Sequence, residues 1–318
     1  MNVHAIAAVE LWVGNARQAT SYFVNAFGFS LTACDRSVGD RVSYQIRQGS
    51  VRLILTGATV RDSPVAEFVR DHGDGVRDVR FAVRGGDGDV ISAFGDTVHS
   101  LVDDARAGDG PGAEHSGADG AAGAGIVAVD HVAVSVDAGE RERCVARYEE
   151  ELGFERFGAA IERIDVGGSA FQMSSVRSRA GDATLVFTEP ADGQSQIADF
   201  LAENHGPGVH HLAFATDDIV RTAATLRARH VRTLPIADAY YPPARERVGD
   251  EALPWDALEE LGILVDRDQD GLLLQAFTDP IGDRPTLYFE IIQRIGATGF
   301  GSDNVKALYH AVSQRAGD

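Results

Sequence analysis

The chain has 318 residues, a length typical of about two domains. Its 29 Lys and Arg against 48 Asp and Glu give a net charge of −19. This charge argues against nucleic acid and against an anionic membrane surface as partners, because both are bound through concentrated positive charge. Two cysteines cannot build a disulfide framework or a cysteine-rich zinc site. No apolar run approaches the roughly 20 residues that span a bilayer, and residues 1–10 lack the basic start of a secretory signal. We therefore expect a cytoplasmic, reduced protein.

The first hundred residues contain one strand–helix–strand–strand pattern and part of another. The predicted elements are a strand over Ala5–Val13, a helix over Ala16–Phe27, and strands over Arg41–Arg47, Val51–Thr56, Asp78–Val83 and Thr97–Val102. Only Arg84–Asp96 separates the last two strands, which is too short for a helix, another strand and their turns. We interpret this part as one repeat unit followed by an eroded one.

The segment Asp103–Gly125 differs from the rest of the chain in composition. It reads DDARAGDGPGAEHSGADGAAGAG, with no aromatic and no large aliphatic residue. Such a segment buries too little apolar area to offset the entropy lost on ordering, so we interpret it as a linker. The predicted organisation is an N-terminal domain over 1–103, a linker over 104–125 and a C-terminal domain over 126–318.

The C-terminal part repeats a βαβββ pattern twice. The first unit has a strand over Ile126–Val136, a helix over Arg141–Phe154, and strands at Ala170–Val176 and Ala183–Phe187. The second has a strand over Gly208–Ala215, a helix over Asp217–His230, and strands at Gly271–Phe277 and Thr286–Ile292. The prediction is an α+β fold of repeated βαβββ units in two domains.

Three residues that can bind a metal occupy matching places in these repeats. His131 and His211 lie in the first strands of the two units, and Glu290 lies in the last strand of the second. They are separated by 80 and 79 residues, close to one repeat each. Two imidazoles and one carboxylate on strands that close around a shared cavity can form a facial triad, which suits Fe(II) and oxygen chemistry.

Each of these residues alone has a simpler explanation. A single strand histidine is more often a satisfied buried or surface residue, and Glu290 alone would best be read as salt-bridged or outward-facing. By alternation, however, Glu290 points opposite to Phe289 and Ile291, and a carboxylate within an apolar strand is costly unless it is paired or binds a metal. The three residues together favour the metal site.

The chain resembles the vicinal oxygen chelate (glyoxalase-like) superfamily and, more closely, the 4-hydroxyphenylpyruvate dioxygenase and 4-hydroxymandelate synthase family. The resemblance covers nearly the whole chain and is strongest after Gly206. It rests on DHVAVSV at Asp130, GPGVHHLAF at Gly206, LGILVDRDQDGLLLQAFTDPIGDRPTLYFEIIQR ending at Arg294, GFGSDNVKALYHAV at Gly299 and HGDGVRDVRFAV at His72.

This resemblance implies an open C-terminal barrel around Fe(II), with His131, His211 and Glu290 as ligands. The choice of His211 over its neighbour follows from the family's V-Q-H pattern, in which His210 takes the place of the Gln. Alternation would place His210 and His211 on opposite faces of the strand. His210 is therefore expected either to support the metal site and substrate or to point outward.

The resemblance also implies substrate contacts. Gln275 and Gln196 match glutamines near the substrate, and Phe300 matches a ring that stacks on it. Ser174 matches a serine of the site wall, with Ser175 as the competing alignment. As alternatives, Gln275 is an ordinary strand amide, Gln196 a polar residue at a helix start, and Phe300 a core residue.

Three departures from the dioxygenase pattern concern the substrate. Thr188 stands in place of an Asn, and His210 in place of a Gln. Val305, followed by Tyr309, stands in place of a Phe. A small aliphatic residue followed by A-L-Y is the pattern that we associate with hydroxymandelate synthases.

The implied reaction joins an aryl 2-oxo acid with O2 on Fe(II). Our first hypothesis is 4-hydroxymandelate synthesis from 4-hydroxyphenylpyruvate. The alternatives are a dioxygenase that forms homogentisate, an oxygenase of a related aryl 2-oxo acid, and a ligand-binding protein without catalysis. We expect the C-terminal helix, Ser302–Gln314, to cover the site as a lid, and the N-terminal part to be structural and a possible contact in a homo-oligomer.

Overall fold

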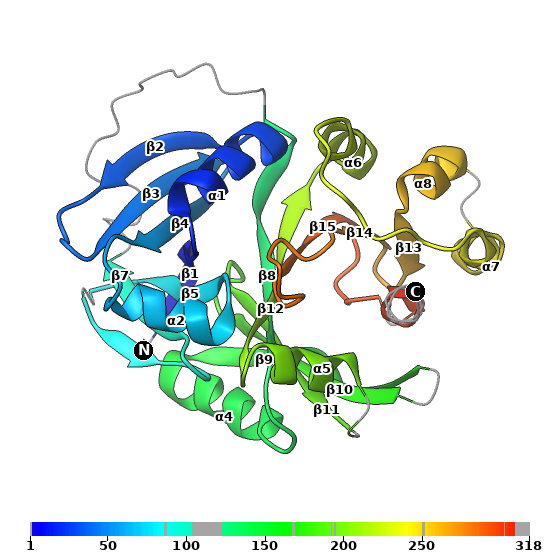
Figure 1. Cartoon of the computed structure of the whole chain (residues 1–318). Helices are drawn as coiled ribbons and strands as arrows, with labels where there is room; N and C mark the ends of the chain where they lie inside the picture. Colours follow the sequence, from blue (N-terminus) through cyan, green and yellow to red (C-terminus); the bar gives the residue numbers. More distant parts are fainter. Residues whose placement is uncertain are drawn as a thin grey trace.

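Two curved mixed sheets lie side by side in the computed structural model (Figure 1). The structure describes residues 2–85, 88–103, 123–166, 169–191, 193, 195–249, 252–301 and 303–308. The expected linker residues 104–122 and the end of the expected lid helix, 309–314, lie outside these ranges. The α+β class and the glyoxalase-like sheets agree with the sequence prediction.

The first sheet, sheet A, contains the strands before residue 104, in the order β2-β3-β4-β1-β5-β7-β6. Its strands are β1 (Val3–Trp12), β2 (Ser30–Asp35), β3 (Arg41–Gln48), β4 (Val51–Ala58), β5 (Gly75–Val83), β6 (Val90–Ser92) and β7 (Val98–Asp103). Its helices are α1 (Ala16–Tyr22), the π-helical turn η1 (Phe23–Phe27) and α2 (Pro64–His72). β5 is followed by the short hairpin β6–β7 without a helix, so the second unit here is reduced.

The second sheet, sheet B, curls into a half-barrel in the order β13-β14-β15-β12-β8-β11-β10-β9. Its strands are β8 (Ile126–Ser135), β9 (Phe154–Val166), β10 (Ser169–Ser178), β11 (Thr184–Pro190), β12 (Gly208–Thr216), β13 (Leu264–Arg267), β14 (Leu272–Phe277) and β15 (Tyr288–Ile295). β8 and β12, the first strands of the two repeat units, pair at the centre of the sheet. The matching positions of the two units therefore meet in one place.

The helices of the second half flank sheet B. They are α4 (Arg141–Leu152), α5 (Gln196–Glu203), α6 (Ile219–Ala228), the 3-10 turn η2 (Asp238–Tyr240), α7 (Tyr241–Val248) and α8 (Trp255–Leu261). Gly153 ends α4 with a φ of 71°, a conformation that glycine adopts readily. Between α6 and β13, the elements η2, α7 and α8 form an insertion that the repeat pattern did not predict, whereas β13 completes the second βαβββ unit. Edge strands β2 and β9 were also missed, since their residues do not alternate cleanly.

Aromatic side chains join the two halves into one core. The rings of Phe23 and Phe27 on η1 meet the ring of Phe289 on β15 at centroid distances of 5.4 and 5.5 Å. Phe29 contacts Phe214 on β12 in the same way, at 6.2 Å. All five side chains are buried. This packing fixes the outer face of β12 and β15, so the residues between these aromatics face the concave side of sheet B.

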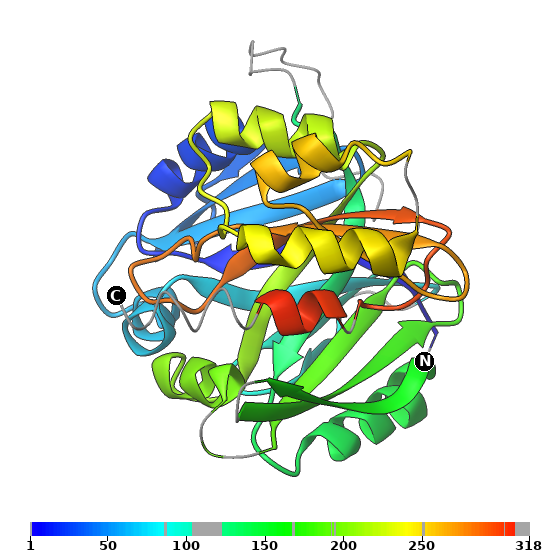
Figure 2. The same cartoon turned by 90° about the vertical axis from the view of Figure 1, so that its right-hand side faces the viewer.

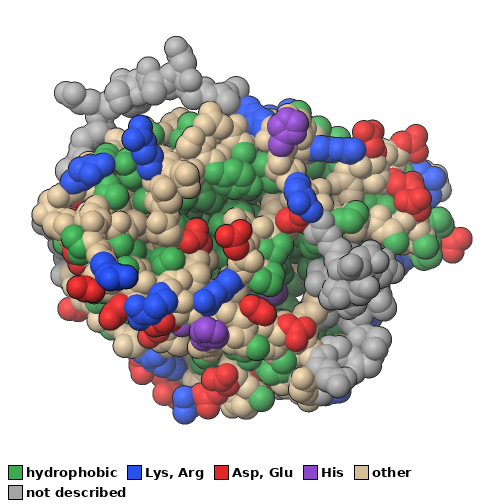
Figure 3. Space-filling model, viewed as in Figure 1, with side chains coloured by type: hydrophobic (Ala, Val, Ile, Leu, Met, Phe, Trp, Pro, Cys, Tyr) green, Lys and Arg blue, Asp and Glu red, His purple; other side chains and the backbone are tan. Residues whose placement is uncertain are grey.

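A short helical segment, residues 303–308, lies across the open side of sheet B beside α7 (Figure 2). Asp303 receives a hydrogen bond at 3.1 Å from Lys306 and pairs with Arg247 of α7 at 3.3 Å. Acidic and basic side chains are interspersed over one face of the molecule, with apolar side chains visible in the hollow at its centre (Figure 3). Within the described ranges, no helix has the length and apolar character needed to cross a membrane.

Candidate metal centre

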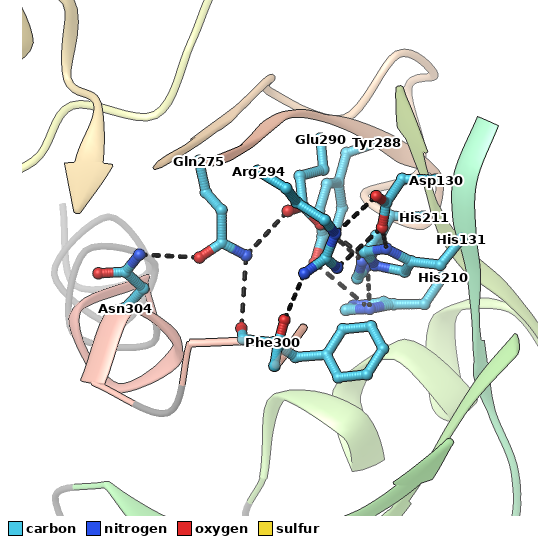
Figure 4. Close-up of polar contacts among 11 residues, drawn as sticks. Asp130, His131, His210, His211, Gln275, Tyr288, Glu290, Arg294, Phe300 and Asn304 are labelled. Atoms are coloured by element: carbon cyan, nitrogen blue, oxygen red, sulfur yellow. Dashed lines mark hydrogen bonds and ion pairs between the residues drawn. The ribbon is translucent and has the colours of Figure 1, made fainter. Parts of the chain in front are cut away.

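His131, His211 and Glu290 converge on the concave side of sheet B (Figure 4). His131 on β8 and Glu290 on β15 are both paired with Ala213 of the intervening strand β12, so they lie in one row across the sheet. Nε2 of His131 lies 3.3 Å from Oε2 of Glu290, and Nε2 of His211 lies 3.4 Å from the same oxygen. One ligand atom from each residue lies within 4.8 Å of the others. Among the described residues, no other group of three His, Cys, Asp or Glu is so arranged.

Burial and mutual charge control the protonation of the three side chains. Burial raises the pKa of a carboxyl group, but the two histidines outweigh this effect and lower the pKa of Glu290 to about 2. Burial lowers the pKa of an imidazole, but Glu290 and Asp130 outweigh it and raise the pKa of His131 to about 9. For His211 burial is the larger effect, and its pKa is lowered. Glu290 is therefore a carboxylate, the charge state that a divalent cation requires.

Each histidine has its Nδ1 beside the residue that directly precedes it. Nδ1 of His131 lies 2.8 Å from Oδ1 of Asp130, and Nδ1 of His211 lies 3.3 Å from Nδ1 of His210. Both preceding residues are β-bulges: the β8–β12 pairing skips Asp130 on one strand and His210 on the other. A bulge breaks the strict alternation of side chains. The expectation that alternation separates His210 from His211 is therefore wrong, and His210 lies against the site.

His210 is enclosed by aromatic rings. The Oη of Tyr288 lies 3.3 Å from its Nδ1, and the Tyr288 ring stacks on His211 at 4.9 Å. Phe200 of α5 meets the His210 ring edge-on at 5.0 Å. Burial, followed by the charge of His211, holds the pKa of His210 well below its usual range. His210 is therefore neutral and can accept a hydrogen bond from His211.

A hydrogen-bonded chain leads from Glu290 to the C-terminal helical segment. Nε2 of Gln275 donates to Oε1 of Glu290 at 2.8 Å, and its Oε1 accepts from Nδ2 of Asn304 at 2.8 Å. Oδ1 of Asn304 accepts from the hydroxyl of Tyr240 at 2.7 Å. Gln275 thus lies beside the triad, and its amide orients the Glu290 carboxylate. Its contact with substrate stays a prediction.

An apolar cluster adjoins the triad on the β8 side. The ring of Phe300 meets the ring of His131 edge-on at 5.2 Å, and Val305 of the helical segment packs into the same cluster. The other members are Ala133, Ile164, Phe171, Met173, Val186, Ile197 and Leu201. A possible metal site beside an apolar cluster suits a ligand with one metal-binding polar end and one apolar end.

The remaining predicted substrate residues lie at different places. Thr188 is buried on β11, and its hydroxyl donates to the carbonyl of Val134 at 3.1 Å. Ser174 lies on the face of β10 that points away from the apolar cluster, and its hydroxyl accepts a hydrogen bond from the buried Arg141. Ser175, the competing alignment, pairs with Val186 of the apolar cluster, so the geometry favours it over Ser174.

Two further predicted substrate residues are Gln196 and Tyr309. Gln196 is half-buried and is the first residue of α5, beside the N-cap Ser195. Ile197, which follows it, belongs to the apolar cluster. Tyr309 lies outside the described residues.

Four residues around the triad were missed by sequence reasoning: Asp130, Tyr288, Arg294 and Asn304. Asp130 and Arg294 form an ion pair with two contacts, at 2.7 and 2.9 Å. A signal for Asp130 was present, because a carboxylate directly before a ligand histidine can hold that histidine's second nitrogen. No signal could have paired Asp130 with Arg294, since 164 residues separate them.

Sheet A holds an ion pair network in place of a metal-binding set. Arg80 on β5 pairs with Glu10 on β1 and, at 3.1 Å, with Asp78. Ser100 on β7 donates to Asp78 at 2.6 Å. A guanidinium therefore neutralises the carboxylates here. The structural role expected of this half stays a prediction.

The donor set of sheet B fits a divalent transition metal. Two imidazole nitrogens and one carboxylate oxygen lie close together, and each of the three side chains has a partner that orients it. His131 and Glu290 are buried, and His211 is partly buried. Such a set binds one face of an octahedral ion and suits Fe(II) that must also bind substrate and oxygen.

Comparisons with known proteins agree with this geometry. Residues 130–246 match the Glyoxalase/Bleomycin resistance protein/Dioxygenase superfamily. The 4-hydroxyphenylpyruvate dioxygenase of Neurospora crassa is 31% identical, over 98% of this chain and 92% of that protein. The enzyme of the same name from Dictyostelium discoideum is 31% identical over 96% of each. The solved structure of a triple mutant of 4-hydroxymandelate synthase from Streptomyces coelicolor is 34% identical, with a TM-score of 0.86 over 99% of both chains.

Proposed function

The chain belongs to the 4-hydroxyphenylpyruvate dioxygenase family and is a non-haem iron dioxygenase, and we propose that it converts 4-hydroxyphenylpyruvate into 4-hydroxymandelate. The reaction consumes one O2 and releases one CO2 for each substrate. One oxygen atom enters the new carboxylate, and the other hydroxylates the benzylic carbon.

His131, His211 and Glu290 would hold the iron. When bound, Fe(II) supplies the open coordination positions at which a 2-oxo acid and oxygen react. Asp130 and Gln275 keep the His131 ring and the Glu290 carboxylate in place through their hydrogen bonds. Because these groups lie on paired strands, the ligand positions are set by the sheet rather than by loops.

The apolar cluster would receive the aryl ring. Phe300 offers a ring face between the triad and the cluster, and Met173 and Phe171 lie on its β10 side. An aryl 2-oxo acid that places its oxygens at the triad can therefore place its ring against Phe300. Phe171 and Met173 are buried, so this side of the cluster would shield the reacting carbon from water.

The observation that carries the choice of product is Val305 in this cluster. It is half-buried and packs against this cluster, at the position where the dioxygenases that the chain resembles have a Phe. A smaller residue leaves room for the aryl ring to shift, and such a shift changes which carbon lies nearest the reacting oxygen. The 34% identity to a 4-hydroxymandelate synthase over 99% of both chains supports the same choice.

Product identification tests the proposal. The protein is loaded anaerobically with Fe(II), then mixed with 4-hydroxyphenylpyruvate and oxygen. The two candidate products have the same mass, so they are separated by chromatography against authentic standards. 4-Hydroxymandelate as the main product is the expected result, and homogentisate as the main product overturns the proposal.

Homogentisate formation is the second candidate function. It is favoured by the curated relatives, which carry the name 4-hydroxyphenylpyruvate dioxygenase at about the same identity. The same metal centre, apolar cluster and substrate serve this alternative. The two functions differ in the carbon that is oxidised, and only oxidation of the ring is accompanied by migration of the acetate side chain.

A further inference from the structure

Arg294, near the end of β15, contacts both Asp130 and the backbone of the segment 297–301 (Figure 4). On one side its Nε and Nη2 donate to the two carboxylate oxygens of Asp130, at 2.7 and 2.9 Å. On the other side its Nη1 donates to the carbonyl oxygen of Gly299 at 2.6 Å. One planar guanidinium thus bridges a carboxylate and a backbone carbonyl.

The Asp130 side leads to the metal centre. Oδ1 of Asp130 lies 2.8 Å from Nδ1 of His131, whose Nε2 faces Glu290. A ligand histidine binds a metal through Nε2 only if its Nδ1 carries the proton, and an acceptor at Nδ1 fixes that arrangement. Arg294 holds this acceptor with a bidentate ion pair, a geometry that restricts its rotation.

The Gly299 side leads to the residues that contact substrate in the proposed function. Gly299 directly precedes Phe300, whose ring lies 5.4 Å from the Arg294 guanidinium and 5.2 Å from the His131 ring. The amide groups of Thr298 and Gly299 both donate to Asp268 at 2.8 Å. The segment 297–301 is therefore held by polar contacts along its length before the helical residues 303–308 begin.

We propose that Arg294 is a positioning residue that couples metal binding at His131 to the placement of the segment 297–301. A metal on Nε2 of His131 favours the Asp130–Arg294 arrangement, and that arrangement holds the carbonyl of Gly299 and the ring of Phe300. Because coupling free energies are reciprocal, order in the segment must favour the metal to the same extent. The inference rests on the metal site of the proposed function, but it does not depend on which product is formed.

The test uses the metal-free full chain and Co(II) as the probe metal. Two quantities are measured: the dissociation constant for Co(II), and hydrogen exchange of a peptide covering residues 296–301 with and without Co(II). The variants are Arg294→Met, which removes the guanidinium, and Arg294→Lys, which keeps its charge. Arg80→Met is the matched control, because Arg80 also bridges buried carboxylates but lies in sheet A.

The wild type is expected to bind Co(II) and to exchange the 296–301 peptide more slowly when Co(II) is bound. Arg294→Met is expected to weaken Co(II) binding about tenfold or more, the usual effect of losing a group that orients a metal ligand. It is also expected to lose at least half of the metal-dependent protection, because Gln275 keeps a weaker contact with the carbonyl of Phe300 at 3.4 Å. Arg294→Lys is expected to behave like Arg294→Met, since one ammonium cannot bond both partners as a planar fork does.

The control separates coupling from general destabilisation. Arg80→Met is expected to lower the melting temperature while leaving both Co(II) measurements unchanged. If Arg294→Met binds Co(II) with wild-type affinity and keeps the wild-type protection of the 296–301 peptide, the coupling is overturned. If Arg294→Lys restores both quantities in full, the bridging role of the guanidinium is overturned. Failure of the wild type to bind Co(II) overturns the metal site itself, whereas formation of homogentisate contradicts only the proposed product.

Discussion

Nδ1 of His131 lies 2.8 Å from Oδ1 of Asp130, the residue directly before it in the chain. His211 has the same relationship to His210, at 3.3 Å between the two Nδ1 atoms. Two bulges in one β-ladder therefore place a supporting side chain behind each metal-site histidine. The two supports differ in charge: His131 is backed by a carboxylate, and His211 by a neutral imidazole.

The support given by His210 predicts a difference between two substitutions. His210→Phe keeps a ring but removes the acceptor for Nδ1 of His211, so metal affinity should fall about tenfold or more. His210→Gln keeps a carbonyl acceptor and should retain affinity within about threefold of the wild type. Isothermal titration of the metal-free variants with Co(II) checks both. Equal affinities for the Phe and Gln variants would show that the contact with His211 does not matter.

We predict that a substitution at Val305 changes the main product. Val305→Phe adds an aromatic ring at the apolar cluster and should raise the ratio of homogentisate to 4-hydroxymandelate at least tenfold, a change of about 1.4 kcal/mol between two barriers. Val305→Ile keeps a branched aliphatic side chain and serves as the control. The product ratio is measured by chromatography at full conversion. An unchanged ratio in Val305→Phe would remove the basis for assigning the product from this residue.

We predict that Arg284 stabilises the protein through its contacts with the end of one helix. Its guanidinium donates to the carbonyls of Asp71 and Arg70 at the end of α2, at 2.5 and 2.9 Å. A cation at a helix C-terminus is favourable, but these contacts are exposed, so Arg284→Ala should lower the free energy of unfolding by about 1 kcal/mol. Urea denaturation measures this change in the free energy of unfolding. Arg232→Ala is the control, because it removes an ion pair between an exposed arginine and Asp279; it should lower the free energy of unfolding by about 0.5 kcal/mol or less. An equal loss of stability in both variants would contradict the role of Arg284 at the helix end.

The buried ring of His99 leads us to predict that the free energy of unfolding depends on pH. Its ring is buried between Tyr148, whose hydroxyl contacts Nε2, and the carbonyl of Val79, 2.8 Å from Nδ1. Burial, despite the contact with Val79, lowers the pKa of His99 to about 4, from about 6.5 in an unfolded chain. Between these values the unfolded chain binds the extra proton, so the free energy of unfolding must fall as the pH falls from about 6.5 to about 4.

The size of this effect is on the order of 3 kcal/mol over the whole interval. His99→Gln removes the titrating group and should flatten the dependence by that amount. Other histidines contribute equally to both proteins, so the difference between the two pH profiles is the informative quantity. It is obtained from urea denaturation at several pH values, and parallel profiles would contradict the assignment.

The triad could be predicted from sequence because its members lie one repeat apart, and the central pairing of β8 with β12 brings equivalent positions together. The orientation of Glu290 also followed from alternation, since Phe289 and Ile291 are buried in the core on the other face. Alternation failed at His210 because a bulge is set by the pairing of two strands and not by either strand alone.

The supporting network was less accessible from sequence. Arg294 and Asp130 are far apart in the chain, and their ion pair exists only because β15 and β8 flank β12. The choice between Ser174 and Ser175 depended on the register of β10 against β11, which one residue reverses. The insertion that contains η2, α7 and α8 carries no repeat signal, yet it supplies Tyr240, which holds Asn304.

The central claim is that His131, His211 and Glu290 together bind the iron. Anaerobic equilibrium dialysis with Fe(II) tests it most directly, on the wild type, Glu290→Ala and the control Asp78→Asn, which alters a buried carboxylate of sheet A. The account predicts one Fe(II) per chain for the wild type and for Asp78→Asn, and affinity at least a hundredfold weaker for Glu290→Ala. Wild-type affinity in Glu290→Ala would contradict it.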